Sequence, residues 1–266
     1  MLRKFGVGVL ALALPVLPVA AQTVDEVIAK NIEARGGLEK LKSVQSIRMT
    51  GKMMMGPGME APMSLEIKRP RSLRMEFTFQ GMTGVQAYDG KNGWSISPFQ
   101  GKKDPEPMSP DDVKDAEEEA DIDGPLIDYK AKGHTVELVG KEKVEGSDAF
   151  KLKVTLKNGT VRHQYIDAES FLEIKTEAKR TIRGSEMEFE STIGDYKDVE
   201  GLLIAHSIQS GAKGRPEKQN IVVEKIELNP VLDDARFRMP ETPKAEAPKA
   251  APAAAAAPKA KPPAQD

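Results

Sequence analysis

The sequence contains no cysteine among its 266 residues. This absence excludes a disulfide framework, a thiol nucleophile and a metal site with cysteine ligands, as well as a lipid-modified amino-terminal cysteine. Histidine is also scarce: His134, His163 and His206 fall on separate expected strands, without the spacing of metal ligands. We therefore expect neither a bound metal nor a cofactor.

Long apolar runs are absent after the first 21 residues. There, Arg3 and Lys4 precede an apolar stretch at residues 5–16, and Val19-Ala20-Ala21 has the small residues of a signal-peptide cleavage site. No later stretch is long and apolar enough to span a bilayer. We therefore expect residues 1–21 to be a secretory signal and the mature chain to be exported and soluble.

No excess of one charge is present either, because 39 Lys and Arg residues face 41 Asp and Glu residues, mixed throughout. A nucleic-acid partner, which needs a concentrated basic face, is therefore not expected.

Catalytic motifs are missing as well: there is no Gly-x-Ser-x-Gly elbow and no phosphate-binding glycine loop. Acids at residues 119–123 resemble the start of a calcium loop, but Pro125 and Lys130 stand where ligands are needed. We interpret these acids as the solvated end of a helix. The sequence thus predicts no catalytic residue, and we do not expect an enzyme.

What the chain does contain is strand periodicity, most clearly at residues 65–99. Apolar residues occupy every second position there, as in Leu73-Arg74-Met75-Glu76-Phe77. A period of two predicts a pleated antiparallel meander with one continuous apolar face. A long strand is expected before it, at residues 44–55, and seven more segments between residues 136 and 228 are rich in strand formers. Asn158-Gly159 predicts a hairpin with a two-residue type I′ turn.

Helices are expected at residues 23–34, 109–121 and 125–131, with a polar loop at 102–108. A sheet of roughly eleven antiparallel strands would curl, and only these short helices are available to cover its inner face. The predicted fold class is therefore mainly β (α+β), a strongly curved antiparallel sheet with short helices as a plug or lid. It forms one domain over residues 22–240, and residues 241–266, rich in Ala, Pro and Lys, are expected to be a disordered tail.

Methionines crowd the first strands of this sheet. Methionine is flexible and polarizable, and it is frequent on surfaces that accept varied apolar partners. Two interpretations remain open: an ordinary sheet core, or a cavity that the short acidic middle helices cover only weakly.

Three motifs resemble the LolA/LolB-like superfamily of outer-membrane lipoprotein-sorting proteins, whose carriers move lipoproteins across the periplasm. They are Leu65-x-Ile67-Lys68-Arg69-Pro70, then Asp89-Gly90-Lys91-x-x-Trp94 with Pro98-Phe99, and Asp234-Ala235-x-x-Phe237-x-x-Pro240. The resemblance implies an incomplete β-barrel with a helical lid over an apolar cavity. It also implies that Arg69 holds the lid closed through hydrogen bonds to lid-helix carbonyls; the alternative is a turn residue before Pro70.

The resemblance further implies a function: a monomeric periplasmic carrier or chaperone that binds acyl chains of lipoproteins or lipids for transport toward the outer membrane. Its partners would be the cargo and the sorting components of the inner and outer membranes. The alternative is an envelope sensor or adaptor of the same fold, which docks a partner protein. The apolar face suggests these lining residues: Met49, Met53, Leu65, Met75, Phe77, Phe79, Val85, Trp94 and Ile96.

Overall fold

The structure is a computed structural model that describes residues 22–56, 58–182 and 185–241. The expected signal at residues 1–21 lies outside the described residues, as does the expected tail from residue 242 onward. Both remain predictions.

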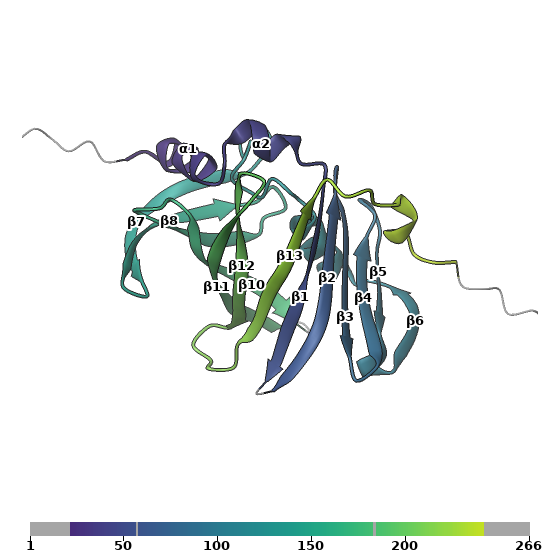
Figure 1. Ribbon diagram of the computed structural model, residues 1–266. Helices are drawn as coiled ribbons and strands as arrows, with labels where there is room; N and C mark the ends of the chain where they lie inside the picture. Colours follow the sequence, from purple (N-terminus) through teal and green to yellow (C-terminus); the bar gives the residue numbers. More distant parts are fainter. Residues whose placement is uncertain (1–21, 57, 183–184, 242–266) are drawn as a thin grey trace, which may run out of the picture.

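One antiparallel sheet of thirteen strands forms the body of the described chain, in the order β6-β5-β4-β3-β2-β1-β13-β12-β11-β10-β9-β8-β7 (Figure 1). The sheet curves, and because β6 and β7 lie at its two edges, it does not close. The predicted class, a mainly β incomplete barrel with few short helices, is confirmed. The strands are β1 (Ser46–Gly56), β2 (Met59–Lys68), β3 (Ser72–Phe79), β4 (Met82–Tyr88), β5 (Gly93–Ser97), β6 (Lys102–Pro107), β7 (Thr135–Val144), β8 (Ser147–Thr155), β9 (Val161–Asp167), β10 (Glu173–Ile182), β11 (Ser185–Val199), β12 (Leu202–Ala212) and β13 (Gln219–Leu228).

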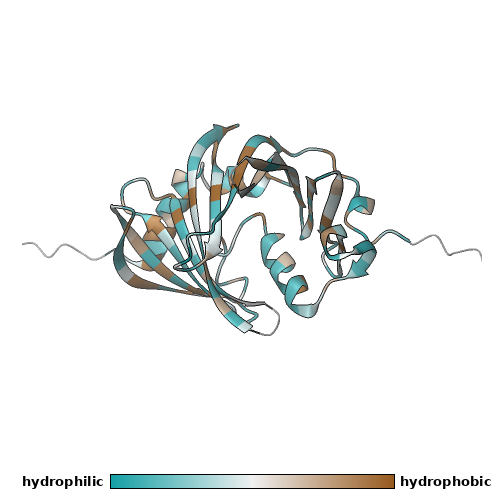
Figure 2. Cartoon of the chain, turned by 90° about the horizontal axis from the view of Figure 1, so that it is seen from below, coloured by the Kyte–Doolittle hydropathy of each residue, from teal (hydrophilic) through white to brown (hydrophobic). Residues whose placement is uncertain are grey.

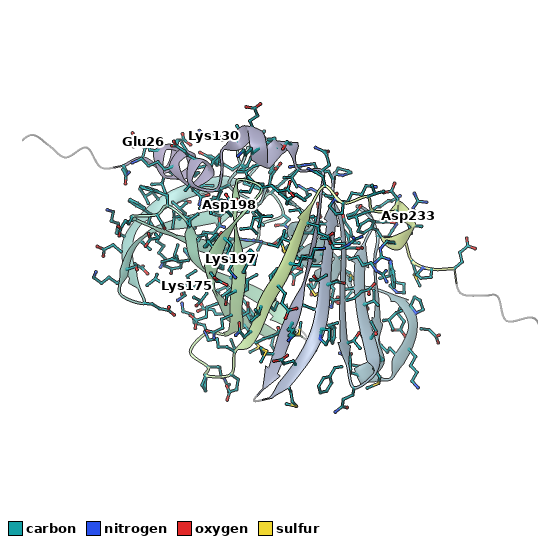
Figure 3. All side chains as sticks on the ribbon, in the orientation of Figure 1. Glu26, Lys130, Lys175, Lys197, Asp198 and Asp233 are labelled. Atoms are coloured by element: carbon teal, nitrogen blue, oxygen red, sulfur yellow. The ribbon has the colours of Figure 1, made fainter. Side chains whose placement is uncertain are left out.

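Two helices precede the sheet, α1 (Val24–Ala34) and α2 (Leu38–Ser43). Thr23 caps α1 in a capping box with Glu26, which is labelled in Figure 3. Val27 and Ile28 turn the apolar side of α1 onto a core that includes Phe150 and other side chains of β7, β8 and β9. The amino-terminal helix therefore covers the second half of the sheet.

The third helix, α3 (Pro110–Glu119), follows β6 and lies on the concave side of the curve (Figure 2). Ser109 begins it by accepting a hydrogen bond from the Asp112 amide, and Pro110 occupies its first turn. Two short 3-10 turns complete the description, η1 (Pro98–Gln100) and η2 (Asp234–Arg236).

Two of the predicted elements were wrong. Residues 102–107, expected to be a loop, form the edge strand β6. An edge strand pairs on one side only, so it tolerates Pro105 and Pro107, which have no N–H to donate to a second neighbour. Residues 125–131, expected to be a helix, form successive turns. Gly124 and Asp128 have positive φ values of 69° and 55°, which interrupt helical geometry.

The hairpin between β8 and β9 is confirmed, but its predicted turn type is wrong. The connection spans residues 156–160, and the Gly159 amide donates to the Leu156 carbonyl at 2.9 Å. Gly159 has a φ of 87°, whereas Asn158 keeps a negative φ and accepts from the Thr160 amide through Oδ1. A type I′ turn needs positive φ at both central residues.

Candidate functional site

The concave face of the sheet brings together six of the nine predicted lining residues. Strand pairing places Met49 opposite Leu65, and Leu65 opposite Met75. Residues directly opposite each other in antiparallel strands share a face. Phe77 and Phe79 continue this face along β3, and Met53 continues it along β1.

The other three predicted residues lie on the opposite, convex face. Met75 pairs with Gln86 on the concave face, so the neighbouring Val85 points to the convex face. Val85 pairs with Ile96 there, and Trp94, two residues before Ile96 on β5, shares that face. Trp94 is 2% exposed, and its Nε1 donates to the Phe237 carbonyl at 2.9 Å. The assignment of Val85, Trp94 and Ile96 to the concave face was therefore wrong: they form a core beneath the carboxyl-terminal segment.

A cavity of about 280 Å³ lies on the concave face, beneath the chain that follows α3. Its walls come from α1, α2, β1, β2, the turn at residues 121–126 and strands β9 to β12. Most of the lining is apolar: Leu41, Val44, Ile47, Met49, Ile67, Ile122, Pro125, Leu126, Ile193, Leu202, Leu203, Ile204 and Ala205.

Met49 is the only one of the nine predicted residues that lines this cavity in the described chain. Leu65 packs instead beneath α3, in the cluster that contains Ile122. Phe77 and Phe79 contact the ring of Phe99, at centroid distances of 5.3 and 6.4 Å. The cavity thus lies between β1 and β2 on one side and β9 to β12 on the other, whereas most of the predicted lining residues lie on β3 to β5.

Helix α3 spans the opening of the curve. Val113, Ala116 and Ala120 pack toward β3 and β4. At the other side of the opening, Glu118 accepts hydrogen bonds from the hairpin between β8 and β9 and pairs with Arg162. Apart from its small apolar side, the helix is hydrophilic (Figure 2). It is therefore a cover held largely by polar contacts at its carboxyl end.

The chain after α3 is also tied to α1. Lys130, labelled beside α1 in Figure 3, pairs with Asp25 at 3.0 Å, and the Tyr129 hydroxyl donates to the same carboxylate at 2.8 Å. Lys132 donates to Asp121 and to the Gly124 carbonyl, the latter at 2.7 Å. These contacts hold residues 121–133, here named the lid segment, over the cavity.

Arg69, at the end of β2, makes the most extensive contact with the lid segment. Its Nη2 and Nη1 donate to the two carboxylate oxygens of Asp123 at 2.6 and 3.0 Å. Its Nε donates to the Val44 carbonyl at 2.7 Å, and Nη2 reaches the Leu41 carbonyl at 3.4 Å. Lys42 pairs with the same carboxylate at 3.0 Å. We name Lys42, Arg69 and Asp123 the latch, since they join α2, β2 and the lid segment.

The charge state of the latch follows from its surroundings. The Asp123 side chain is 6% exposed, and this burial alone would raise its pKa. Hydrogen bonds from Arg69 and Lys42 outweigh the burial and lower the pKa of Asp123 to about 2. The carboxylate is therefore ionised at neutral pH, and the latch is a bidentate ion pair.

Sequence reasoning missed the acidic partner of Arg69. The prediction that the acids at residues 119–123 are solvated was wrong for Asp123, which is 5% exposed. The carbonyls that Arg69 contacts belong to the end of α2 and the residue that caps it. The apolar pair Leu126-Ile127 was a signal for this burial, because both side chains pack in the core and hold the nearby Asp123 close to it. Whether Arg69 gates the cavity remains a prediction.

The described residues hold no group of three or more His, Cys, Asp or Glu side chains placed to bind a metal ion. In the described part of the chain, no helix combines the length and apolar character needed to cross a bilayer.

Comparison with known proteins identifies the fold. No family model matches the sequence, and no curated protein matches it. Among solved structures, a LolA superfamily protein from Nitrosomonas europaea aligns with a TM-score of 0.55 and 13% identity over 82% of this chain and 98% of its own. A domain from Vibrio parahaemolyticus described as an outer membrane lipoprotein-sorting protein aligns with a TM-score of 0.54 and 15% identity over 79% and 94%. A DUF1329 family protein from Desulfovibrio piger aligns with a TM-score of 0.57 and 12% identity over 82% and 98%. The resemblance that the motifs indicated is confirmed at the level of the fold.

Proposed function

We propose that this protein is a periplasmic carrier or chaperone, which binds acyl chains of lipoproteins or lipids and transports them toward the outer membrane. The observation that carries the proposal is the apolar cavity on the concave face, closed by a cover whose contacts are mostly polar. The descriptions of two similar structures, one from the LolA superfamily and one a lipoprotein-sorting protein, support the same class of cargo. The expected signal at residues 1–21 supports export.

Binding in this proposal is burial without a covalent step. Each methylene removed from water contributes about 0.8 kcal/mol, so even a modest length of acyl chain gains substantial free energy. The cavity of about 280 Å³ is slightly smaller than ordinary ligand pockets, which begin at roughly 300 Å³. We therefore regard the structure as the closed state, in which the lid segment must move before a long chain enters.

The cover is suited to such a movement. Within α3, Ala116 is the buried residue, so little apolar area holds the helix in place. Ion pairs that remain partly exposed, such as Arg71 with Glu117 at 2.7 Å, contribute little net stability. The latch is the exception, because its carboxylate is buried. Breaking and re-forming the pair of Arg69 with Asp123 is thus the proposed switch between cargo-bound and empty states.

Native mass spectrometry of protein purified from the periplasm, with lipid extraction alongside, tests the proposal. We expect copurified acyl lipid or lipopeptide at a near one-to-one ratio. A mass equal to the chain alone, together with no uptake of an added fatty-acyl probe, would contradict it. That result would favour the envelope sensor or adaptor that docks a partner protein.

A further inference from the structure

One end of the cavity is polar. Asn31 of α1, Gln164 of β9, Glu173 of β10 and Tyr196 of β11 line it, opposite the apolar walls supplied by β1 and β2. Gln164 is 4% exposed, so its amide is removed from bulk water. Such a polar group needs hydrogen-bond partners when it is buried.

The orientation of the Gln164 amide follows from its neighbour. Its Nε2 donates to both carboxylate oxygens of Glu173, each at 3.0 Å. The two carboxylate oxygens of Glu173 accept from the amide nitrogen, so Oε1 of Gln164 points away from Glu173. The hydroxyl of Thr176 also donates to Glu173. The carboxylate is therefore supplied with donors, whereas Gln164 Oε1 is buried without a partner among the described residues.

We infer that this polar end binds the head of the cargo, and that the preferred head is neutral and presents a hydrogen-bond donor, such as an amide N–H or a hydroxyl. The inference rests on the proposed function and adds the substrate class. Gln164 Oε1 is closed to solvent in this closed state, so a donor from the ligand satisfies it once the lid segment has moved. A carboxylate head supplies no donor and places a second negative charge near Glu173, which costs free energy in a buried site.

The charged residues around the cavity allow one alternative mode of binding for the head. Asp121 and Asp123 line it too, but Asp121 is paired with Lys132, and Asp123 is paired within the latch with Arg69 and Lys42. Arg35, at the end of α1, is the only cation lining the cavity in the described chain. Capture of an anionic head by Arg35 is therefore the alternative that an experiment must separate.

Three probes with the same chain and different heads make this test: decanamide, decanol and decanoate. Their binding to the mature full-length chain is measured by calorimetry at neutral pH. We expect decanamide and decanol to bind about tenfold or more tightly than decanoate, because a site built around an unpaired acceptor rejects a ligand without the donor.

Two variants locate the effect. Gln164→Met removes the acceptor and is expected to abolish the preference for decanamide over decanoate. Glu173→Gln removes the charge at nearly constant shape and is expected to strengthen decanoate binding. The matched control is Glu169→Gln, an exposed residue in the turn before β10, which should leave all three affinities unchanged. If Gln164→Met does not fold, Glu173→Gln carries the comparison.

The outcomes separate this inference from the proposed function. Equal binding of the three probes would overturn the inference alone, as would tighter binding of decanoate that is lost in Arg35→Met. An unchanged preference in both Gln164→Met and Glu173→Gln would also overturn it. Failure to bind any probe would overturn the proposed function and this inference together.

Discussion

Asp123→Asn removes one negative charge from the latch and keeps the shape of the side chain. Arg69 then loses its bidentate ionic partner but retains its contacts with the carbonyls of Val44 and Leu41. Lys42 retains its second partner, Asp128. The substitution therefore weakens the link between β2 and the lid segment without leaving either cation wholly unpaired.

The magnitude follows from the pKa of Asp123, which falls from 3.8 to about 2 in the folded chain. A shift of this size corresponds to about 2 kcal/mol of stabilisation of the charged form. We expect Asp123→Asn to lose about that much free energy of unfolding at neutral pH. Because the latch stabilises the closed state, the open fraction rises, and acyl-probe affinity should increase by up to about thirtyfold.

Urea denaturation and titration with a fluorescent acyl probe measure the two effects. Asp128→Asn is the matched control, since it also removes a carboxylate from Lys42 but at a side chain that is 50% exposed. Its effect should stay within about 0.5 kcal/mol. A folded Asp123→Asn variant with unaltered stability and unaltered probe affinity would refute the assignment of the latch.

Three further predictions concern the two faces of the sheet, α3 and acid stability. Met49→Lys should abolish acyl-probe binding. Trp94→Phe, on the convex face, should leave the probe affinity unchanged but lower the free energy of unfolding by about 1 kcal/mol, because the hydrogen bond of Trp94 is lost. Equal effects of the two substitutions on affinity would contradict the face assignment. Glu118→Ala should destabilise the chain by about 2 kcal/mol in urea denaturation, because the half-buried Arg162 loses its charged partner and Asn158 and Thr160 lose their acceptor. Glu117→Ala, at a more exposed pair, should cost under about 1 kcal/mol. Burial alone would raise the pKa of Glu177, but hydrogen bonds from two lysines and a tyrosine lower it from 4.5 to about 2. The ionised Glu177 therefore contributes up to about 3 kcal/mol to the free energy of unfolding above pH 4.5, and this contribution is lost as the pH falls toward 2. Between neutral pH and about pH 3, the Glu177→Gln variant should thus lose less stability than the parent chain.

The alternation of apolar residues predicted most strands, because a half-exposed sheet imposes a period of two on the local sequence. Strands β7 to β13 were predicted in this way, as seven segments between residues 136 and 228. Strand β6 was not, since its charges and prolines are tolerated only through its position at the sheet edge. That position depends on the whole topology and leaves no local signal.

The site was less predictable, because it depends on contacts between distant segments. Val85 and Ala87 are as buried as Tyr88 on the other face of β4, so hydrophobicity there does not distinguish the two faces. The segment that covers the convex face, around Phe237, lies 143 residues beyond Trp94. The pair of Arg69 with Asp123 likewise joins residues 54 positions apart, so no spacing rule could find it.

Photo-crosslinking with an acyl probe that carries a diazirine along its chain tests the central claim most directly, since it reports both binding and place. After irradiation of the purified mature chain, peptide mass spectrometry identifies the modified residues. We expect adducts on the cavity walls, at residues such as Met49, Ile122 and Ile204. Adducts confined to the convex face around Trp94, or no adduct at all, would contradict an acyl-binding cavity beneath the lid segment.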